Sequence, residues 1–274
     1  MNPPVPAAAP ADLSPDAPVR VEAASVAYGN RRALSGIDLT ISPGERVAII
    51  GPSGAGKTTL FRLVSGLVKP QEGRVLTLGR DTRRLAGRPL ARLRREVGFL
   101  HQRDNLVSEL RVVHNVLMGR LGHWVLPRSL LSLLWPQEID RARAALARVE
   151  LADRIWSLPG ELSGGQQQRV AVARLMVQQP RLVLADEPVS ALDLRLGREV
   201  IELLCDMATQ DGVTLLVNLH TLDLLQGHFD RVIALREGLL FWQGRPEEIS
   251  QDLLRELYGA EYRALHLDQV ALPA

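Results

Sequence analysis

The chain has 274 residues and a net charge of +2, and hydrophobic residues make up 46% of it. This composition allows one large α/β domain or two small ones, and it argues against global disorder. The small net charge argues against a protein that binds nucleic acid through a broad basic surface, so no nucleic-acid partner is expected.

The first 18 residues are rich in alanine and proline and lack the basic start and apolar core of a signal peptide, so a flexible tail is expected over 1–18. No stretch reaches the ~18 uninterrupted apolar residues that a membrane span needs. Cys205 is the only cysteine. It therefore cannot form an intramolecular disulfide and favours a reducing compartment, and it is expected to fill the core from within a helix around 199–208.

Short strands are expected over 19–41, and a phosphate-binding loop follows them. The sequence Gly-Pro-Ser-Gly-Ala-Gly-Lys-Thr-Thr fits the pattern G-x-x-x-x-G-K-[ST], between an apolar strand at 47–50 and a helix with apolar residues at 60–64. In that context the backbone N–H groups converge on an anion and the helix start adds its positive dipole end. Lys57 is expected to reach the outer phosphates and Thr58 to ligate Mg²⁺. The phosphate-binding residues are expected to be Gly51, Pro52, Ser53, Gly54, Ala55, Gly56, Lys57, Thr58 and Thr59. A glycine-rich turn that merely contains a lysine is the alternative.

Strands are predicted at 74–78 and 97–100, and then the pattern changes to helices at 112–121, 130–135 and 139–149. Apolar strands return at 182–185 and 215–219, each after a helix. Strand–helix–strand repetition predicts a parallel sheet covered on both faces, with the helical stretch, about 105–165, inserted into it.

A second group of glycines opens a later helix. Ser163 is a good N-cap, and Gly164 and Gly165 expose backbone N–H groups at the helix start, so this segment is a candidate for a second anion site. An ordinary capped helix is the alternative.

The strand at 182–185 ends in the carboxylates Asp186 and Glu187. Ligands of doubly wound sheets bind beyond the carboxyl ends of the strands, so Asp186 is expected near Lys57, where it could hold Mg²⁺. Glu187 could polarise the attacking water. A solvated acidic turn is the alternative.

Two further elements end the chain. Residues 232–235 and 239–242 flank Arg236-Glu237-Gly238, which predicts a hairpin. A final helix carries apolar residues on one face, including Leu254, Leu257 and Tyr258. The domain predicted from 19 to 246 would thus be followed by a helical extension over 247–274.

Taken together, these elements resemble the ATP-binding cassette (ABC) ATPases. Leu162-Ser-Gly-Gly-Gln166 matches the signature of that family, and the resemblance covers about 19–244. It implies the ABC ATPase fold, which has a phosphate-loop (RecA-like), mostly parallel α/β core, an N-terminal antiparallel β subdomain and an inserted helical subdomain. ATP and Mg²⁺ are the implied ligands.

The remaining family motifs occur in order along the chain. By resemblance, Tyr28 stacks on adenine, Gln102 senses Mg²⁺ and the lytic water, Asp193 belongs to the D-loop, and His220 contacts the γ-phosphate. The implied catalytic residues are Glu187, His220, Lys57 and Gln102. The implied metal ligands are Thr58, Gln102 and Asp186. The implied nucleotide contacts beyond the loop are Tyr28, Ser163, Gly164, Gly165, Gln166 and Asp193.

The resemblance implies two copies arranged head to tail, because Ser163, Gly164 and Gly165 would serve the ATP held by the other copy. Without a membrane span, an importer ATPase also needs two permease subunits, indirectly a solute-binding protein, and a peripheral place on the cytoplasmic face of the membrane. A permease is expected to dock between Gln102 and the helical insertion, around 107–135, where the apolar residues are Leu117, Trp124, Leu130 and Trp135. A core role for these residues within the helical subdomain is the alternative.

A closer resemblance is to the ATPases of phosphonate importers, through the segments 119–122, 128–131, 163–169 and 217–220. One departure is His101-Gln102, where such ATPases usually carry Phe-Gln. Import of phosphonate or a related phosphorus oxyanion is therefore expected. A soluble ABC accessory protein of phosphonate breakdown remains the alternative. The signature argues against a GTPase or a small-molecule kinase, and the short insertion argues against a DNA-maintenance ABC protein.

Overall fold

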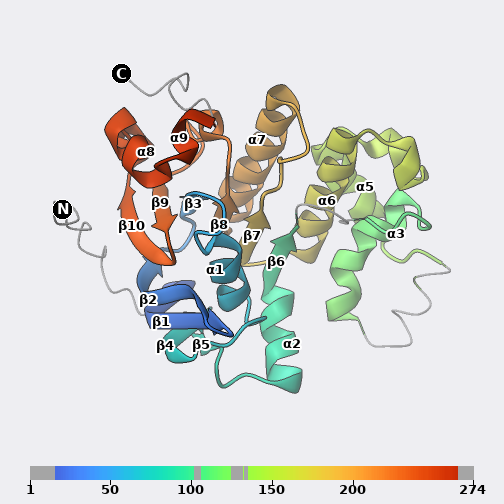
Figure 1. The fold of residues 1–274 in the computed structure, drawn as a ribbon. Coiled ribbons are helices and arrows are strands. Elements are labelled where there is room, and N and C mark those ends of the chain that lie inside the picture. Colours follow the sequence, from blue (N-terminus) through green and yellow to red (C-terminus); the bar gives the residue numbers. More distant parts are fainter. Residues whose placement is uncertain (1–15, 102–105, 125–131, 133–134, 265–274) are drawn as a thin grey trace. The chain divides into compact units, whose positions relative to one another are not determined.

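The structure, a computed structural model, describes residues 16–101, 106–124, 132 and 135–264 (Figure 1). These residues fall into two compact units. One contains the chain up to Leu93 and again from Thr214 onward, and the other contains Arg94–Val213. The N-terminal tail predicted over 1–18 lies almost wholly outside the described residues.

The first unit begins with an antiparallel sheet in the strand order β2-β1-β4-β5. Its strands are β1 (Val19–Tyr28), β2 (Arg31–Ile41), β4 (Glu72–Thr77) and β5 (Arg80–Asp81). A two-residue turn, Gly29-Asn30, joins β1 to β2, and Tyr28 pairs with Arg31 across it. This turn places the end of β1 directly beside the start of β2.

The first unit also holds parallel strands that carry the phosphate loop. Strand β3 (Arg46–Ile50) runs parallel to β8 (Thr214–Asn218) and β9 (Arg231–Arg236), and β10 (Leu239–Gly244) closes an antiparallel hairpin on β9. Residues 47–50 and all of β8 are buried, as expected for central parallel strands. The helices of this unit are α1 (Lys57–Val64), α8 (Gln251–Tyr258) and α9 (Glu261–Ala264).

In the second unit, β6 (Val97–Leu100) pairs in parallel with β7 (Leu182–Asp186). Its helices are α3 (Val112–Leu117), α5 (Ile139–Arg148), α6 (Gly164–Gln178) and α7 (Leu194–Asp211). Helix α6 is the centre of this unit, because α3, α5 and α7 all pack against it. Cys205 is buried in α7, as predicted.

The structure confirms the predicted hairpin and the parallel pairing of the strands, and it shortens one predicted helix. Helix α3 ends at Leu117 and continues as a 3₁₀ segment, Met118–His123, rather than as α-helix to 121. A Cβ at Gly119 in that segment would collide with the carbonyl oxygen of Arg174, so the chain passes close to α6 there. The helix predicted at 130–135 lies almost wholly outside the described residues.

Helix α2 (Gly87–Glu96) was absent from the sequence-based prediction and runs across the boundary between the two units. Its leucines at helical spacing are Leu90 and Leu93, of which Leu93 alone is buried, so its apolar pattern is short. Pro89 in its first turn was the available signal. Within the described part of the chain, none of the helices combines the length and apolar character required to cross a bilayer.

Candidate active site

The phosphate-binding loop lies between β3 and α1. The backbone has positive φ at Gly51 (143°), Gly54 (76°) and Gly56 (106°), a region that side chains with a Cβ rarely adopt. A Cβ at Gly51 would also collide with the carbonyl oxygen of Leu235, and one at Gly56 would lie 2.6 Å from Ala33 O. Both the backbone conformation and the space around it therefore require glycine at Gly51 and Gly56.

Lys57 is the first residue of α1, and its side chain is almost completely buried, with 5% exposed. The ammonium Nζ donates to the carbonyl oxygens of Gly51 (2.6 Å) and Pro52 (3.1 Å). These two carbonyl oxygens replace the water molecules that the Lys57 ammonium loses on burial. Helix α1 has glycine as its N-cap and no acidic residue in its first turn, so its positive end is left for an anion.

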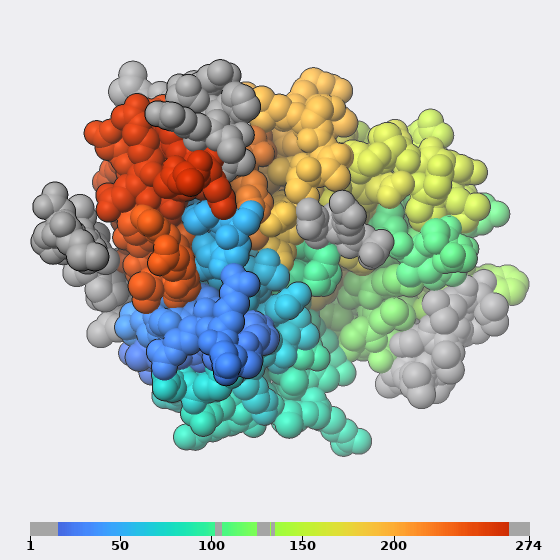
Figure 2. Space-filling view, in the orientation of Figure 1, coloured from blue at the N-terminus to red at the C-terminus, as the bar shows by residue number. Residues whose placement is uncertain are grey.

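Neighbouring elements of the first unit brace the loop. Gly238, in the β9–β10 turn, donates its N–H to Ala55 O (3.1 Å) and accepts from Ser35 N–H through its own carbonyl (2.8 Å). The C-terminal helices also reach it: the Tyr258 hydroxyl, on a side chain 4% exposed, faces the backbone N–H of Gly51. Burial raises the pKa of Tyr258 to about 12. Figure 2 shows these helices (red) beside the segment after β3 (light blue).

Two other predicted site residues belong to this unit. Tyr28 ends β1 with 48% of its surface exposed, as a residue that stacks on a ligand requires. His220 follows β8, and the preceding Leu219 donates its N–H to Ile49 O (3.0 Å). His220 therefore leaves its strand level with the end of β3, at the edge of the sheet where the loop begins.

The second unit holds the signature segment. Ser163 caps α6: its Oγ accepts from Gln166 N–H (3.3 Å), and Gln166 Oε1 accepts from Ser163 N–H (2.9 Å), a reciprocal capping box. Gly164 and Gly165 lie close to leucines on either side of Asp193. A Cβ on Gly164 would lie 3.5 Å from Leu192, and one on Gly165 would lie 3.4 Å from Leu196. The predicted N-cap is present, and Gln166 orients Ser163.

The two carboxylates follow β7 in the same unit. Asp186 ends the strand, and Glu187 has φ +52°, a strained backbone conformation for a residue with a Cβ. Helix α6 fixes this turn, because Gln168 Nε2 donates to Pro188 O (2.8 Å). Asp193 then caps α7 through Oδ1, which accepts from Leu196 N–H (2.9 Å).

The predicted site residues thus form two groups, one in each unit. The structure brings the phosphate loop, Tyr28 and His220 to neighbouring segments of the first unit, and Ser163, Glu187 and Asp193 to neighbouring segments of the second. Gln102 lies outside the described residues. The sequence patterns missed Arg31, Gln168 and Tyr258, which touch the motifs from other elements. Arg31 stands directly after the turn Gly29-Asn30, three residues after Tyr28, and this position was the only available signal.

The expected permease-docking residues differ in exposure. Leu117 and Trp124 are buried and belong to the core of the second unit, whereas Trp135 is 74% exposed. Leu130 lies outside the described residues.

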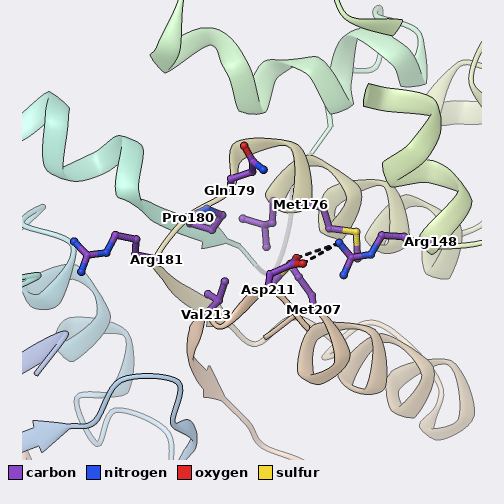
Figure 3. Close-up of a pocket in the computed structure, with 9 residues that line it drawn as sticks. Arg148, Met176, Gln179, Pro180, Arg181, Met207, Asp211 and Val213 are labelled. Carbon is purple, nitrogen blue, oxygen red and sulfur yellow. Dashed lines mark hydrogen bonds and ion pairs between the residues drawn. The ribbon is translucent and has the colours of Figure 1, made fainter. Parts of the chain in front are cut away.

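A cavity of about 390 Å³ in the second unit lies away from these motifs (Figure 3). Its lining includes Pro180 and Arg181, just before the start of β7, whereas Asp186 ends that strand. Its best-defined polar contact is internal, because Arg148 Nη1 lies 3.1 Å from Asp211 Oδ2. This cavity is therefore distinct from the region of the two carboxylates.

Comparisons with known proteins agree with these motifs. A family model described as "ABC transporter" matches residues 34–190. The chain is 46% identical over 229 residues to a phosphonates import ATP-binding protein, PhnC 1, of Pseudomonas syringae, which covers 84% of this chain and 86% of that protein. It is 44% identical to the PhnC protein of Pseudomonas putida, over 91% of this chain and 93% of that protein.

Solved structures show the same fold. The chain matches cbiO1 of Clostridium perfringens, part of the ABC transporter complex cbiONQ, with a TM-score of 0.75 and 29% identity over 93% of this chain and all of that one. It matches the dimeric ABC transporter cassette MJ0796 with a TM-score of 0.71 and 32% identity over 83% of this chain and 98% of that one. These matches confirm the predicted fold class, and the chain belongs to the ABC transporter family as an ATP-binding cassette.

Proposed function

We propose that this chain is the ATP-hydrolysing subunit of an ABC importer for phosphonate or a related phosphorus oxyanion. The observation that carries the ATPase assignment is the loop Gly51–Gly56, shaped by positive-φ glycines around the buried Lys57 ammonium. The cargo assignment is supported by the names of the relatives at 44–46% identity, which are phosphonate import proteins.

The chain's own residues would act mainly by positioning and by charge stabilisation, as phosphoryl transfer requires. The loop N–H groups and Lys57 would hold the β- and γ-phosphates, and Tyr28 would stack on the adenine ring. Glu187 would orient and polarise the attacking water, and His220 would contact the γ-phosphate.

Thr58, Gln102 and Asp186 would hold Mg²⁺. The hydroxyl of Thr58 and the carboxylate of Asp186 are hard oxygen donors, and they suit an ion that normally takes few protein ligands and completes its shell with phosphates and water. When bound, Mg²⁺ neutralises the charge on the outer phosphates.

A second copy of the chain would complete each site. The signature segment of one copy would cover the γ-phosphate held by the other; its residues are Ser163, Gly164, Gly165 and Gln166. Asp193 would lie at the interface between the two copies. The solved MJ0796 cassettes that this chain resembles are dimeric, including one with bound ADP and Pi, which supports this arrangement.

In the proposed importer, this chain would bind two permease subunits, which would hold it on the cytoplasmic face of the membrane. A solute-binding protein would act with the permease and so be an indirect partner. Exposed apolar side chains of the second unit, including Val107 and Trp135, are candidates for the permease contact.

The test is growth on a phosphonate as sole phosphorus source in a strain that lacks this chain. The parent chain is expected to restore growth and to co-purify with a membrane permease. Lys57→Ala is expected not to restore growth, because it cannot drive transport with ATP. Growth restored by Lys57→Ala would contradict an ATP-driven role. A parent chain that supported phosphonate use without any membrane partner would favour the soluble accessory protein.

A further inference from the structure

The β1–β2 hairpin places a second cation at the phosphate loop. Arg31 is the first residue of β2, directly after the two-residue turn that follows Tyr28. Its Nη2 lies 2.9 Å from the position that a Cβ on Gly54 would occupy. Since Gly54 is exposed, the guanidinium lies at the open side of the loop.

The side chain of Arg31 is exposed and makes no hydrogen bond or ion pair with another residue in the part of the chain that the structure describes. The next residue differs. Arg32 Nη2 lies 4.0 Å from Glu72 Oε1, and Arg32 lines a small cavity with Gln71 and Glu72. Successive side chains of a strand point to opposite faces, which explains why only Arg31 reaches the loop.

The surroundings of Arg31 suit an anionic ligand. The first turn of α1 has no acidic residue, and Lys57 already donates to two loop carbonyls. A guanidinium fork matches the geometry of phosphate oxygens and keeps its charge at any physiological pH.

We propose that Arg31 binds the triphosphate of the nucleotide held by the loop, as a contact outside the G-x-x-x-x-G-K-[ST] pattern. This inference rests on the proposed function, because it takes a nucleoside triphosphate as the ligand. Arg31 thereby links the hairpin that carries Tyr28 to the phosphates as well as to the base.

The experiment measures equilibrium binding of ATP and of AMP to the full chain, with EDTA present to prevent hydrolysis. Arg31→Ala is expected to weaken ATP binding about 10-fold, the usual cost of a lost charge-assisted hydrogen bond. AMP binding is expected to change less than about 2-fold, because AMP lacks the outer phosphates. Arg32→Ala is the matched control and is expected to bind ATP like the parent. Arg31→Lys keeps the charge and is expected to lose less than Arg31→Ala.

The other outcomes overturn the proposal in distinguishable ways. If the parent binds ATP and Arg31→Ala binds it equally well, or if ATP and AMP binding fall by the same factor, Arg31 does not contact the triphosphate. If Arg32→Ala loses as much as Arg31→Ala, the effect is one of general surface charge. If the parent itself does not bind ATP, the proposed function fails and this inference fails with it. Thermal unfolding without nucleotide is expected to be the same for all variants, because both arginines are exposed.

Discussion

At the scale of single residues, Glu187 combines a strained backbone with a carboxylate directly after the end of β7. A positive φ at a residue with a Cβ costs about 1–3 kcal/mol and persists where the surrounding structure enforces it. Here the turn is held by Gln168 from α6 and by the Ser190 side chain, whose Oγ donates to Glu187 O (3.3 Å). The fold thus holds the backbone of the turn that carries Glu187 in one conformation.

Glu187→Gln is expected to keep ATP binding and to lower the hydrolysis rate by about 10²–10³, because the amide cannot polarise the water as a carboxylate does. Steady-state phosphate release and equilibrium ATP binding measure the two effects. Glu150→Gln is the control, since Glu150 also has positive φ (60°) but its carboxylate pairs with Arg169, which is not a predicted site residue. Hydrolysis by Glu187→Gln at the parental rate would refute the assigned role.

Gly56→Ala is expected to destabilise the protein more than Gly212→Ala. Both residues have positive φ, so both substitutions strain the backbone by about 1 kcal/mol or more, but only Gly56 has a neighbouring backbone, Ala33 O, in the way of a Cβ. Urea unfolding of the two variants measures the difference. Equal losses of stability would show that the loop can shift away from β2.

At the scale of elements, α6 joins the signature segment to the carboxylate turn. Ser163 caps the start of this helix, and Gln168, one turn further, bonds Pro188 O. A rigid helix can therefore transmit a displacement at Ser163 to the turn that carries Glu187.

Gln168→Ala is expected to lower the maximal hydrolysis rate several-fold while the binding of ATP stays unchanged, because the substitution frees the turn without touching the phosphate loop. Measurement of kcat alongside the equilibrium affinity for ATP separates the two. Gln210→Ala, in α7, is the control. A pure change in ATP affinity would contradict a positioning role.

The Asp230 carboxylate joins the start of β9 to the start of β3. Arg46 donates a side-chain hydrogen bond to it (2.6 Å) and also its backbone N–H (2.9 Å), and these bonds lower the pKa of Asp230. A lowered folded-state pKa means that the contribution to stability is present above the unfolded-state value, about 3.9, and is lost as the pH falls through the folded-state value.

Asp230→Asn is expected to lower the free energy of unfolding at pH 7 by less than about 1 kcal/mol, because the side chain is 44% exposed and screened. The difference from the parent should begin to fall at about pH 4 and should vanish only once the pH is below the lowered folded-state pKa of Asp230. Urea unfolding of both proteins between pH 2 and 7 measures it. A difference that persisted unchanged at pH 2 would mean that charge is not its cause.

Most elements could be predicted from the sequence because their apolar pattern is strong, as in β3, β7 and β8. The 3₁₀ segment after α3 could not be predicted, since the carbonyl of Arg174 that crowds Gly119 comes from a distant element. Helix α2 has only Leu90 and Leu93 at helical spacing, and this pattern is too short to predict a helix. Within the site, the sequence motifs identify the residues of the phosphate loop. Arg31 and Tyr258 contact that loop, and Gln168 contacts the carboxylate turn, through tertiary contacts that no local pattern encodes.

At the scale of the whole molecule, the two groups of site residues belong to different units, and each copy exposes Ser163. The proposed function requires that a second copy cover the bound nucleotide. With ATP, Glu187→Gln is expected to have about twice the mass of the single chain, 30.2 kDa, by light scattering. Adding Ser163→Arg should restore the monomer by crowding the seam, whereas adding Ser108→Arg should not. A monomer at all ATP concentrations would rule out this assembly.

The burial of Lys57 gives the protein a built-in chemical reporter. The sequence contains only two lysines, Lys57 and the exposed Lys69. An amine-reactive reagent should therefore label Lys69 quickly and Lys57 slowly, and mass spectrometry can distinguish the two peptides. The slow rate would record how often the Lys57 ammonium leaves its carbonyl acceptors, and so how readily the loop opens.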